Sequence, residues 1–356
     1  MFKFKKNNII IIVAILLILI IINYLFFKKN IENYYKTNFT DLIDAAPREY
    51  EWNKLSPTDK EFNPTVITYN KSLTGNNAYG IVDGDIIKIN NITKTTSNNF
   101  LSKIDFKKNM QVDAIDVAYY EHNIQRPATD IFALGSDNFM YHYRSFDGAS
   151  KVKNVILDFP TAKWRKISFF TTNFSYSNER CFIISGSGNS LYYFPKFLAG
   201  FKVNYNPDNY TDYFTKLGGY KINVCPINVN LKQVCYDFNS QNTLLLTQDG
   251  MIYYCKNNLN NLMMEPITWT LLETTGINIS YIYLRGTYLM YISENKVYIH
   301  NLYNNKSVKI ERYPENFIPA KVCFGGSILK TNDFILLQNI DGVTFYSIMI
   351  NNKSLQ

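Results

Sequence analysis

The sequence has few of the residues from which metal and nucleophilic sites are built. It contains only three histidines, which lie far apart, and no histidines or cysteines at the short paired spacing of a zinc site. It also has no Gly-x-Ser-x-Gly motif and no glycine-rich phosphate loop. We therefore expect no metal, no cofactor and no catalytic residues, in a protein that is not an enzyme.

The chain also lacks a basic region of the kind that binds nucleic acid. Its 37 Lys and Arg against 29 Asp and Glu give a net charge of +8. Five of the lysines lie within the first 29 residues, which leaves 32 basic and 29 acidic side chains, or +3, for the rest: Lys3, Lys5, Lys6, Lys28 and Lys29. Nucleic-acid-binding domains concentrate their basic residues in one patch, so no nucleic-acid partner is predicted.

The one long hydrophobic run stands near the N-terminus. Residues 9–27 read IIIIVAILLILIIINYLFF, which as a helix matches the roughly 30 Å hydrocarbon core of a bilayer. A cleaved signal peptide is the alternative, but no small-residue cleavage site follows the run. The lysines before it favour a cytoplasmic N-terminus (1–8), a membrane helix (9–27) and a polar stalk (28–48). The domain 49–356 would then lie outside, in a lumen or on a virion surface.

Beyond the stalk, the residues point to repeated β-hairpins. The segment NTLLLTQDGMIYYCK (242–256) sets Asp249-Gly250 between two apolar runs, the signature of a type I′ turn. Similar segments recur every 46 to 61 residues or so, and an apolar strand-like element precedes most of them. Each unit then holds about four short strands, the content of a propeller blade. The six hairpin segments are 78–90, 130–144, 181–194, 242–256, 288–302 and 333–348.

The three tryptophans share one local pattern. Trp52, Trp164 and Trp269 begin WNKL, WRKI and WTLL, each about 25 to 32 residues before a hairpin turn. We interpret them as packing residues between blades. His142 and His300 also fall at similar places in two hairpins, which favours a shared, outward strand position over metal ligation.

Together these elements resemble the tectonin or tachylectin-like propellers, and more loosely the regulator of chromosome condensation repeats. The segments 269–299 and 232–254 fit best, whereas most of the repeat glycines of those families are missing. The resemblance implies an all-β fold, a β-propeller of six or seven four-stranded blades, which here would follow the membrane helix predicted from residues 9–27. Two packed sandwiches or jelly rolls would also produce many short strands at regular spacing.

One interval between hairpins is longer than a blade connection requires. Residues 195–221 mix Tyr, Asn and Asp with Pro and Gly, and long loops on a rigid scaffold are where binding concentrates. The alternative is an insertion packed against the rim of the propeller. The candidate binding residues, for a sugar or a protein partner, are Tyr205, Asp208, Tyr210, Asp212 and Tyr213.

Two further expectations depend on the compartment. Cys225 and Cys235 are the best candidate disulfide among five cysteines, unless all five are small buried core residues. Asn-x-Ser/Thr sequons become glycosylation sites only in a eukaryotic secretory lumen. They begin at Asn38, Asn70, Asn91, Asn173, Asn209, Asn278, Asn305 and Asn352.

Three functions fit these observations. The first is a single-pass, membrane-anchored propeller that is non-catalytic and binds a protein partner or has a structural role, for example in a virion or at a cell surface. The second is a surface lectin, which the tectonin resemblance implies and which would repeat a polar and aromatic pocket in each blade. The third is a propeller-type glycoside hydrolase with paired carboxylates in a central cleft.

Overall fold

The structure is a computed structural model in which the chain forms two compact units, residues 1–46 and 47–356. It describes residues 17–19, 21–22, 52–54, 66–69, 78–89, 101–104, 112–121, 127–135, 139–146, 153–160, 167–175, 178–185, 188, 190–194, 220–224, 227–237, 242–256, 267–325 and 332–350.

The described strands of the second unit form six four-stranded antiparallel sheets. Three of them are β2–β5 (Val66–Tyr69, Ala78–Val82, Asp85–Ile89, Leu101–Ile104), β6–β9 (Val112–Glu121, Pro127–Gly135, Phe139–Phe146, Lys153–Pro160) and β10–β13 (Ile167–Ser175, Asn178–Ser185, Leu191–Phe194, Tyr220–Ile222). The next two are β14–β17 (Leu231–Asp237, Asn242–Thr247, Ile252–Lys256, Thr270–Leu271) and β18–β21 (Ile279–Arg285, Tyr288–Ser293, Lys296–Asn301, Lys306–Lys309). The last joins β22–β24 (Pro319–Gly325, Asn332–Asn339, Thr344–Ile350) to β1 (Asn53–Lys54).

The six predicted hairpins are confirmed, and each supplies the second and third strands of its sheet. The apolar element before a hairpin is the first strand, as in β14 and β18. Second strands such as β15 and β19 are buried along their whole length. Such a strand has a neighbouring sheet on each face, which is why its sequence is a nearly continuous apolar run and does not alternate.

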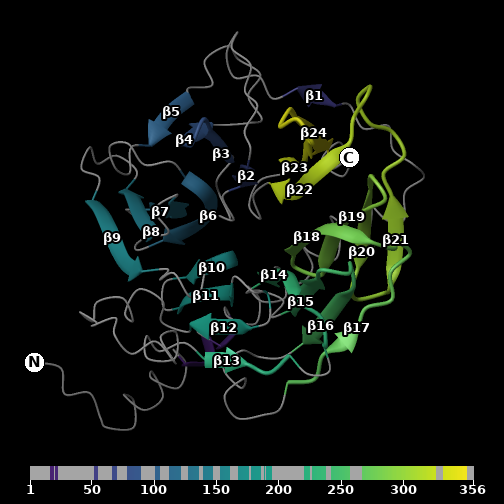
Figure 1. The fold of residues 1–356 in the computed structure, drawn as a ribbon, viewed down its shortest axis with the longest axis horizontal. Coiled ribbons are helices and arrows are strands. Elements are labelled where there is room, and N and C mark those ends of the chain that lie inside the picture. The colour runs from purple at the N-terminus through teal and green to yellow at the C-terminus, as the bar shows by residue number, and fades with distance from the viewer. Residues whose placement is uncertain are drawn as a thin grey trace, which may run out of the picture. The chain divides into compact units, whose positions relative to one another are not determined.

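The first strands join the sheets into a closed ring. Along the chain, β2 contacts β6, β6 contacts β10, and the series continues through β14, β18 and β22 back to β2. The sheets follow one another in chain order around this ring (Figure 1). The N-terminal strand β1 pairs with β24, so that strands from both ends of the domain complete one sheet. This arrangement is a β-propeller, and it excludes the sandwich alternative.

The core lies between neighbouring sheets. Phe182 of β11 packs against Tyr193 of its own sheet and against Tyr236 of the next, with ring centroids 5.0 and 5.6 Å apart. A second cluster joins Leu244 and Leu246 of β15 to Ile282 of β18. Burying one such side chain contributes roughly 1.5–3 kcal/mol. A single isolated sheet would leave both of its apolar faces exposed to water, so stability depends on the packing of neighbouring sheets within the ring.

The expected type I′ turn forms in one Asp-Gly hairpin and not in another. Asp83 and Gly84 both have positive φ, 51° and 79°. The prediction for Asp249-Gly250 is wrong, because of these two only Gly250 has positive φ, 80°. There Thr247 N–H donates to Met251 O at 3.0 Å across a three-residue loop. The Thr247 hydroxyl also accepts from Met251 N–H at 3.0 Å, which favours the longer loop.

Five of the six first strands have a bulge near their start. The register shifts between Leu231 and Gln233 of β14 and between Ile279 and Tyr281 of β18, and the same shift occurs in β6, β10 and β22. A bulge puts two residues opposite one and increases the local twist. It lies where the chain enters each of these five sheets and so sets which first-strand side chains face the next sheet.

The predicted membrane helix 9–27 falls largely outside the described residues. Leu17–Leu19 and Ile21–Ile22 are described; they are helical, and their side chains are about half exposed. Within the described part of the chain, no helix has both the length and the apolar character to cross a membrane.

Candidate binding surface

One end of the ring exposes an unusual number of aliphatic side chains. Here the chain turns from the second to the third strand of each sheet and crosses from the last strand of one sheet to the first strand of the next. We call this end the crossing face. Its described segments are the turns at 83–84, 188, 248–251, 294–295 and 340–343 and the crossings at 223–224, 227–230, 272–278 and 310–318.

Backbone hydrogen bonds join these segments into one surface. Gln248 N–H donates to Asn230 O at 2.8 Å, and Ile279 N–H donates to Gly250 O at 3.3 Å. Gly250 is required here because a Cβ would lie 2.6 Å from the Ile279 nitrogen, in addition to the positive φ. The turn of the β14–β17 sheet therefore lies between two crossings.

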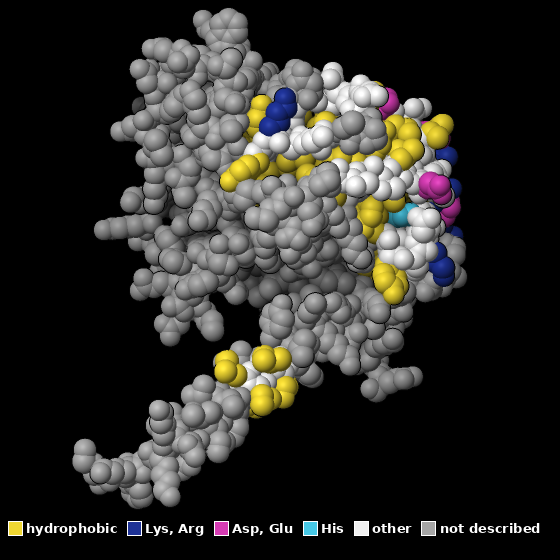
Figure 2. Space-filling view, turned by 90° about the horizontal axis from the view of Figure 1, so that it is seen from below, with side chains coloured by type: hydrophobic (Ala, Val, Ile, Leu, Met, Phe, Trp, Pro, Cys, Tyr) yellow, Lys and Arg dark blue, Asp and Glu magenta, His cyan; other side chains and the backbone are white. Residues whose placement is uncertain are grey.

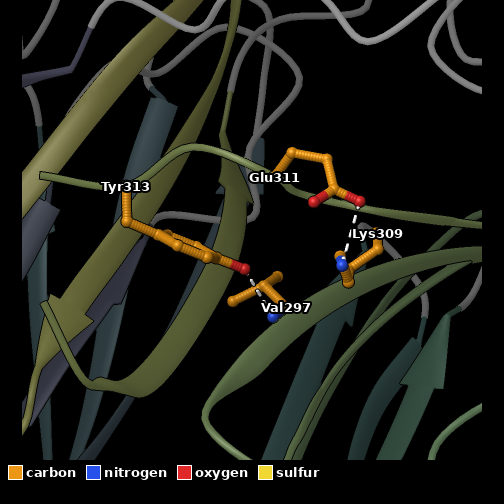
Figure 3. Close-up of polar contacts among 4 residues, drawn as sticks. All are labelled: Val297, Lys309, Glu311 and Tyr313. Atoms are coloured by element: carbon orange, nitrogen blue, oxygen red, sulfur yellow. Dashed lines mark hydrogen bonds and ion pairs between the residues drawn. The ribbon is translucent and has the colours of Figure 1, made fainter.

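The same pattern continues across the next two sheets. Val297 N–H donates to the Tyr313 hydroxyl at 2.7 Å, which ties the start of β20 to the 310–318 crossing (Figure 3). Ile340 N–H then donates to Ile318 O at 3.0 Å. In Figure 3 the Lys309 amine also meets the Glu311 carboxylate, 3.0 Å away. The crossing face is thus held in place over three consecutive sheets.

Five aliphatic side chains stand on these linked segments. Ile340 is 71% exposed and Ile277 64%, and Ile318, Met251 and Val229 are about 40% exposed. Single exposed apolar residues are normal on a protein surface, but a contiguous group is typical of an interaction site.

Exposed apolar residues also occur elsewhere in the described part. Tyr220 of β13 and Leu271 of β17 are 43% and 45% exposed on last strands. Figure 2 views the molecule from that side and shows hydrophobic side chains beside acidic and basic ones. What sets the crossing face apart is that its members come from five loops joined by hydrogen bonds.

The charged residues in the described part of the crossing face are mostly of one sign. The described turns and crossings include a single basic residue, Arg312. Against it stand seven acids: Asp83, Asp249, Glu273, Glu294, Glu311, Glu315 and Asp341. The chain as a whole has a charge of +8, so the described part of this face is acidic by comparison. Clusters of one sign steer partners of the opposite sign.

A second polar region lies on the first strands. Gln233 of β14 is 5% exposed, and its amide donates to Ile282 O at 2.6 Å and accepts from Ile282 N–H at 3.1 Å. β18 is an edge strand of its sheet, so no neighbouring strand bonds to the backbone of Ile282 on this edge. The Gln233 side chain makes the two hydrogen bonds that a neighbouring strand would make. The Cys235 thiol donates to the same carbonyl at 3.5 Å.

Equivalent positions in other sheets carry different chemistry. The bulge register aligns Gln233 with Tyr281 and with Lys321 of β22. Burial lowers the pKa of Lys321 to about 8. Burial also raises the pKa of the Cys323 thiol to about 12, although the charges of Arg285 and Lys321 partly lower it. The described first strands therefore offer a set of unlike side chains in place of a repeated pocket.

The predicted binding residues lie outside the described residues. The chain leaves β12 at Phe194 and enters β13 at Tyr220, so the interval that holds Tyr205, Asp208, Tyr210, Asp212 and Tyr213 joins a third strand to a fourth strand. Those strand ends lie opposite the crossing face. The interval stays a candidate site, with no contact described.

Two of the tryptophans occupy equivalent places. Trp269 immediately precedes β17 and donates its indole N–H to Asn223 O at 2.9 Å. Trp52 immediately precedes β1 and donates to Arg312 O at 2.9 Å. Each stands before the last strand of its sheet and bonds to the chain just beyond the last strand of the preceding sheet. Trp164 lies outside the described residues, in the part of the sequence between β9 and β10.

The remaining predicted sites are only partly described. Cys225 lies outside the described residues, so its pairing with Cys235 stays a prediction. Asn278 and Asn305 are exposed residues with positive φ, and Asn173 lies in β10. The other sequons fall outside the described residues. None of the described His, Cys, Asp and Glu side chains gather in threes as metal ligands do.

Sequence reasoning missed the exposed apolar residues of the crossing face. Ile340 stands beside Asp341-Gly342 in a turn, and Ile277 stands two residues before β18. The only sequence signal for these surface residues was an apolar residue within a predicted turn or just before a predicted strand. Their common placement depends on the ring, which no local pattern shows.

No protein-family model and no curated protein matches the sequence. Among solved structures, YCF48 from Cyanidioschyzon merolae is similar with a TM-score of 0.49 and 10% identity, over 83% of this chain and 98% of that chain. The Cps50 (Swd1) β-propeller domain of Myceliophteria thermophila also has a TM-score of 0.49 and 10% identity, over 84% and 100%. Sqt1 of Saccharomyces cerevisiae has a TM-score of 0.45 and 7% identity, over 84% and 98%. The propeller fold is assigned from the strand pairing and the ring of contacts between sheets.

Proposed function

We propose that the chain is a membrane-anchored, six-bladed β-propeller that binds a protein partner through its crossing face and does no catalysis. The observation that carries the proposal is the linked group of exposed aliphatic residues, led by Ile277 and Ile340, on an acidic end of the ring. A partner of matching chemistry has an apolar centre with Lys and Arg around it.

The contacts between first strands support a count of six blades. The six described sheets contact one another in sequence, and β22 contacts β2. A seventh blade would have to stand between two first strands that already touch. This reasoning supports six blades.

The anchor is proposed from the sequence, with 9–27 as a single-pass helix and the N-terminus in the cytoplasm. The exposed apolar side chains of Leu17–Leu19 and Ile21–Ile22 support a helix that faces lipid. The propeller would then lie outside, in a lumen or on a virion surface. Protease added to sealed native vesicles, with a tag at the C-terminus, tests this. Cleavage of the tag from the cytoplasmic side would refute the orientation.

Partner binding is tested by photo-crosslinking in the native membrane. A photo-reactive amino acid replaces Ile277 or Ile340 and, as the matched control, Tyr303. Tyr303 is 73% exposed and lies between β20 and β21, at the opposite end of the sheet. We expect a discrete protein adduct from Ile277 and Ile340 only, and a weaker one after Asp341→Lys. Equal adducts from Tyr303, or none from any position, would contradict the proposal.

The lectin remains the alternative that the tectonin resemblance suggests. A lectin of that type repeats one pocket in each blade, whereas Gln233, Tyr281 and Lys321 differ at equivalent described positions. A glycan array distinguishes the two functions. Binding that survives Ile277→Ser and Asp341→Lys would favour the lectin.

A further inference from the structure

One histidine is buried between two sheets without a full set of hydrogen-bond partners. The side chain of His300 in β20 is 1% exposed, and its Nδ1 lies 2.7 Å from the Ser307 hydroxyl of β21. Among the residues that the structure describes, nothing bonds to its buried Nε2. Such an atom requires a physical explanation, because the large majority of buried polar atoms in folded proteins have a partner.

His300 belongs to a cluster of side chains on one face of the β18–β21 sheet. The strand register pairs His300 with Leu289 and Tyr298 with Tyr291, so these side chains share the face that packs on the β14–β17 sheet. The rings of Tyr291 and Tyr298 are stacked, with centroids 5.0 Å apart. The Ser307 hydroxyl also lowers the pKa of Tyr291, which agrees with this placement. Packed neighbours therefore connect His300 to Tyr291.

Tyr291 in turn supports the 272–278 crossing, which presents Ile277 on the crossing face. The Tyr291 hydroxyl lies 2.9 Å from the Thr275 hydroxyl. Gly276 packs so closely on the same ring that an added Cβ would lie 2.9 Å from its Cε2 atom. The position of Ile277 thus depends on where the Tyr291 ring lies.

A second proton on His300 would disrupt this cluster. The neutral ring has one N–H, whereas the imidazolium has two and carries a positive charge. The charged ring needs a partner for the proton on Nε2, and the packed face must open to admit water there. Burial lowers the pKa of His300, in agreement with this cost.

The titratable groups around His300 are mostly neutral or cationic. Those on the same face of its own sheet are Tyr291, Tyr298, Lys296 and Lys309, the last of which pairs with Glu311 at 3.0 Å. The neighbouring sheet, the 272–278 crossing, the 302–305 loop and β22 contribute Cys235, Asp237, Tyr254, Lys256, Glu273, Tyr303, Lys321 and Cys323. Because burial alone shifts the pKa of His300, none of these described groups stabilises the imidazolium.

We propose that His300 is a proton sensor for the crossing face, and that its protonation releases the 272–278 crossing from Tyr291 and displaces Ile277. This inference rests on the proposed function, because it concerns regulation of the same binding surface. The two states are a neutral form with the crossing docked on Tyr291 and a protonated form with the crossing released. A partner that needs Ile277 in place then dissociates on acidification.

Hydrogen exchange of the full chain in detergent tests the sensor without any partner. The amides to follow are those of Leu272 and Ile279 at the two ends of the crossing, which donate to Ile252 O and Gly250 O at 2.8 and 3.3 Å. After correction for the intrinsic exchange rate, their protection should fall by up to about tenfold between pH 7 and about pH 5.5, one unit below the ordinary histidine pKa of 6.5.

The crossing before β14 is the internal reference. The amides of Ile227 and Leu231 hold it by bonds of 2.7 and 2.6 Å, and their protection should not change with pH. An equal fall at this reference would show general destabilisation by acid and overturn the proposal. Unchanged protection of the 272–278 crossing at about pH 5.5 would overturn it as well.

Three variants locate the response. His300→Asn keeps a polar atom beside Ser307 but does not titrate, so it should abolish the pH dependence. His142→Asn, which removes a histidine of β8 in another sheet, should preserve it. Thr275→Val removes the hydroxyl that contacts Tyr291 at nearly constant volume, so exchange should be fast at both pH values. A pH response that survives in His300→Asn would refute the assignment.

The partner is followed by a photo-reactive residue at Ile340, which leaves the 272–278 crossing unaltered. We expect its protein adduct in the native membrane to weaken from pH 7 to about pH 5.5, and to stay constant in His300→Asn. An adduct of equal strength at both pH values would overturn the inference while supporting the proposed function. No adduct at either pH, together with pH-dependent exchange, would refute the proposed function and support the proton sensor.

Discussion

Replacement of Gln233 by Met tests how the ring is held together. The Gln233 amide satisfies both backbone groups of Ile282, with distances of 2.6 and 3.1 Å, across the junction of two sheets. Methionine has nearly the same volume, so the substitution leaves no cavity and removes only the two hydrogen bonds. The change isolates the polar contribution to the contact between β14 and β18.

The magnitude follows from what remains buried. Each backbone group that loses its partner in a buried place costs about 1–3 kcal/mol. The Cys235 thiol stays near Ile282 O at 3.5 Å and offsets part of this cost at the carbonyl, although nothing replaces the acceptor for the N–H. We therefore expect a loss of about 3 kcal/mol in the free energy of unfolding, or roughly 6 °C in Tm for a domain of this size.

Urea unfolding of the detergent-solubilised chain, followed by tyrosine and tryptophan fluorescence, measures the loss. Gln248→Met is the matched control, because Gln248 is exposed and its amide only reaches Leu231 O at 3.5 Å. We expect the control to change stability by less than about 0.5 kcal/mol. Equal stability of the two variants would refute the reasoning that Gln233 takes the place of a neighbouring strand.

Three further predictions follow from single side chains. Lys321 has a pKa of about 8 in the fold and 10.5 when unfolded, so between these pH values the unfolded state binds more protons and the stability of the protein rises with pH. At pH 7 the Lys321→Met variant should therefore be more stable than the parent protein by up to about 3 kcal/mol. Urea unfolding at a series of pH values should show this difference disappear toward pH 10. His300 is 1% exposed and burial lowers its pKa, so stability relative to His300→Leu should fall as the pH drops from 7 to 5, and a constant difference would contradict this. Trp269→Phe removes a bond of 2.9 Å and should cost about 1 kcal/mol by calorimetry, more than Trp52→Phe, because Trp269 is buried and Trp52 half-buried.

The repeated hairpins could be read from the sequence because their signals are local. An apolar run, a turn residue and an aromatic strand lie within 15 residues, and the pairing of Leu246 with Ile252 follows directly. The four-stranded content of each unit followed from the spacing. Ring closure could not be predicted from the sequence, because it pairs Asn53 with Tyr346, nearly 300 residues away.

Register is where the sequence analysis failed. His142 and His300 were predicted at a shared, outward position, which is wrong. His142 pairs with Phe132 and His300 with Leu289, and the first-strand register aligns Phe132 with Met290. The two histidines are therefore displaced by one residue in strand register, so their positions are not equivalent. His300 is also buried, with Nδ1 bonded to the Ser307 hydroxyl at 2.7 Å.

The candidate site was hidden for a related reason. Three of its residues lie one or two positions before a first strand: Val229, Ile277 and Ile318. In the sequence they cannot be told from the apolar residues of the strand that follows. Only the antiparallel pairing puts those positions at the same end as the turns that hold Met251 and Ile340.

Closure of the ring also links the fold to the proposed anchor. The strand β1 pairs with β24 through only Asn53 and Lys54, and it follows the segment that would join the propeller to the membrane. Two ladder pairs stabilise little, so the indole bond from Trp52 to Arg312 O supplies part of what holds this end. The last sheet is complete only when residues from both ends of the domain meet, which makes its formation a long-range and slow step. The pairing of β1 with β24 is the shortest ladder in this sheet, and tension on the proposed anchor would act on it first.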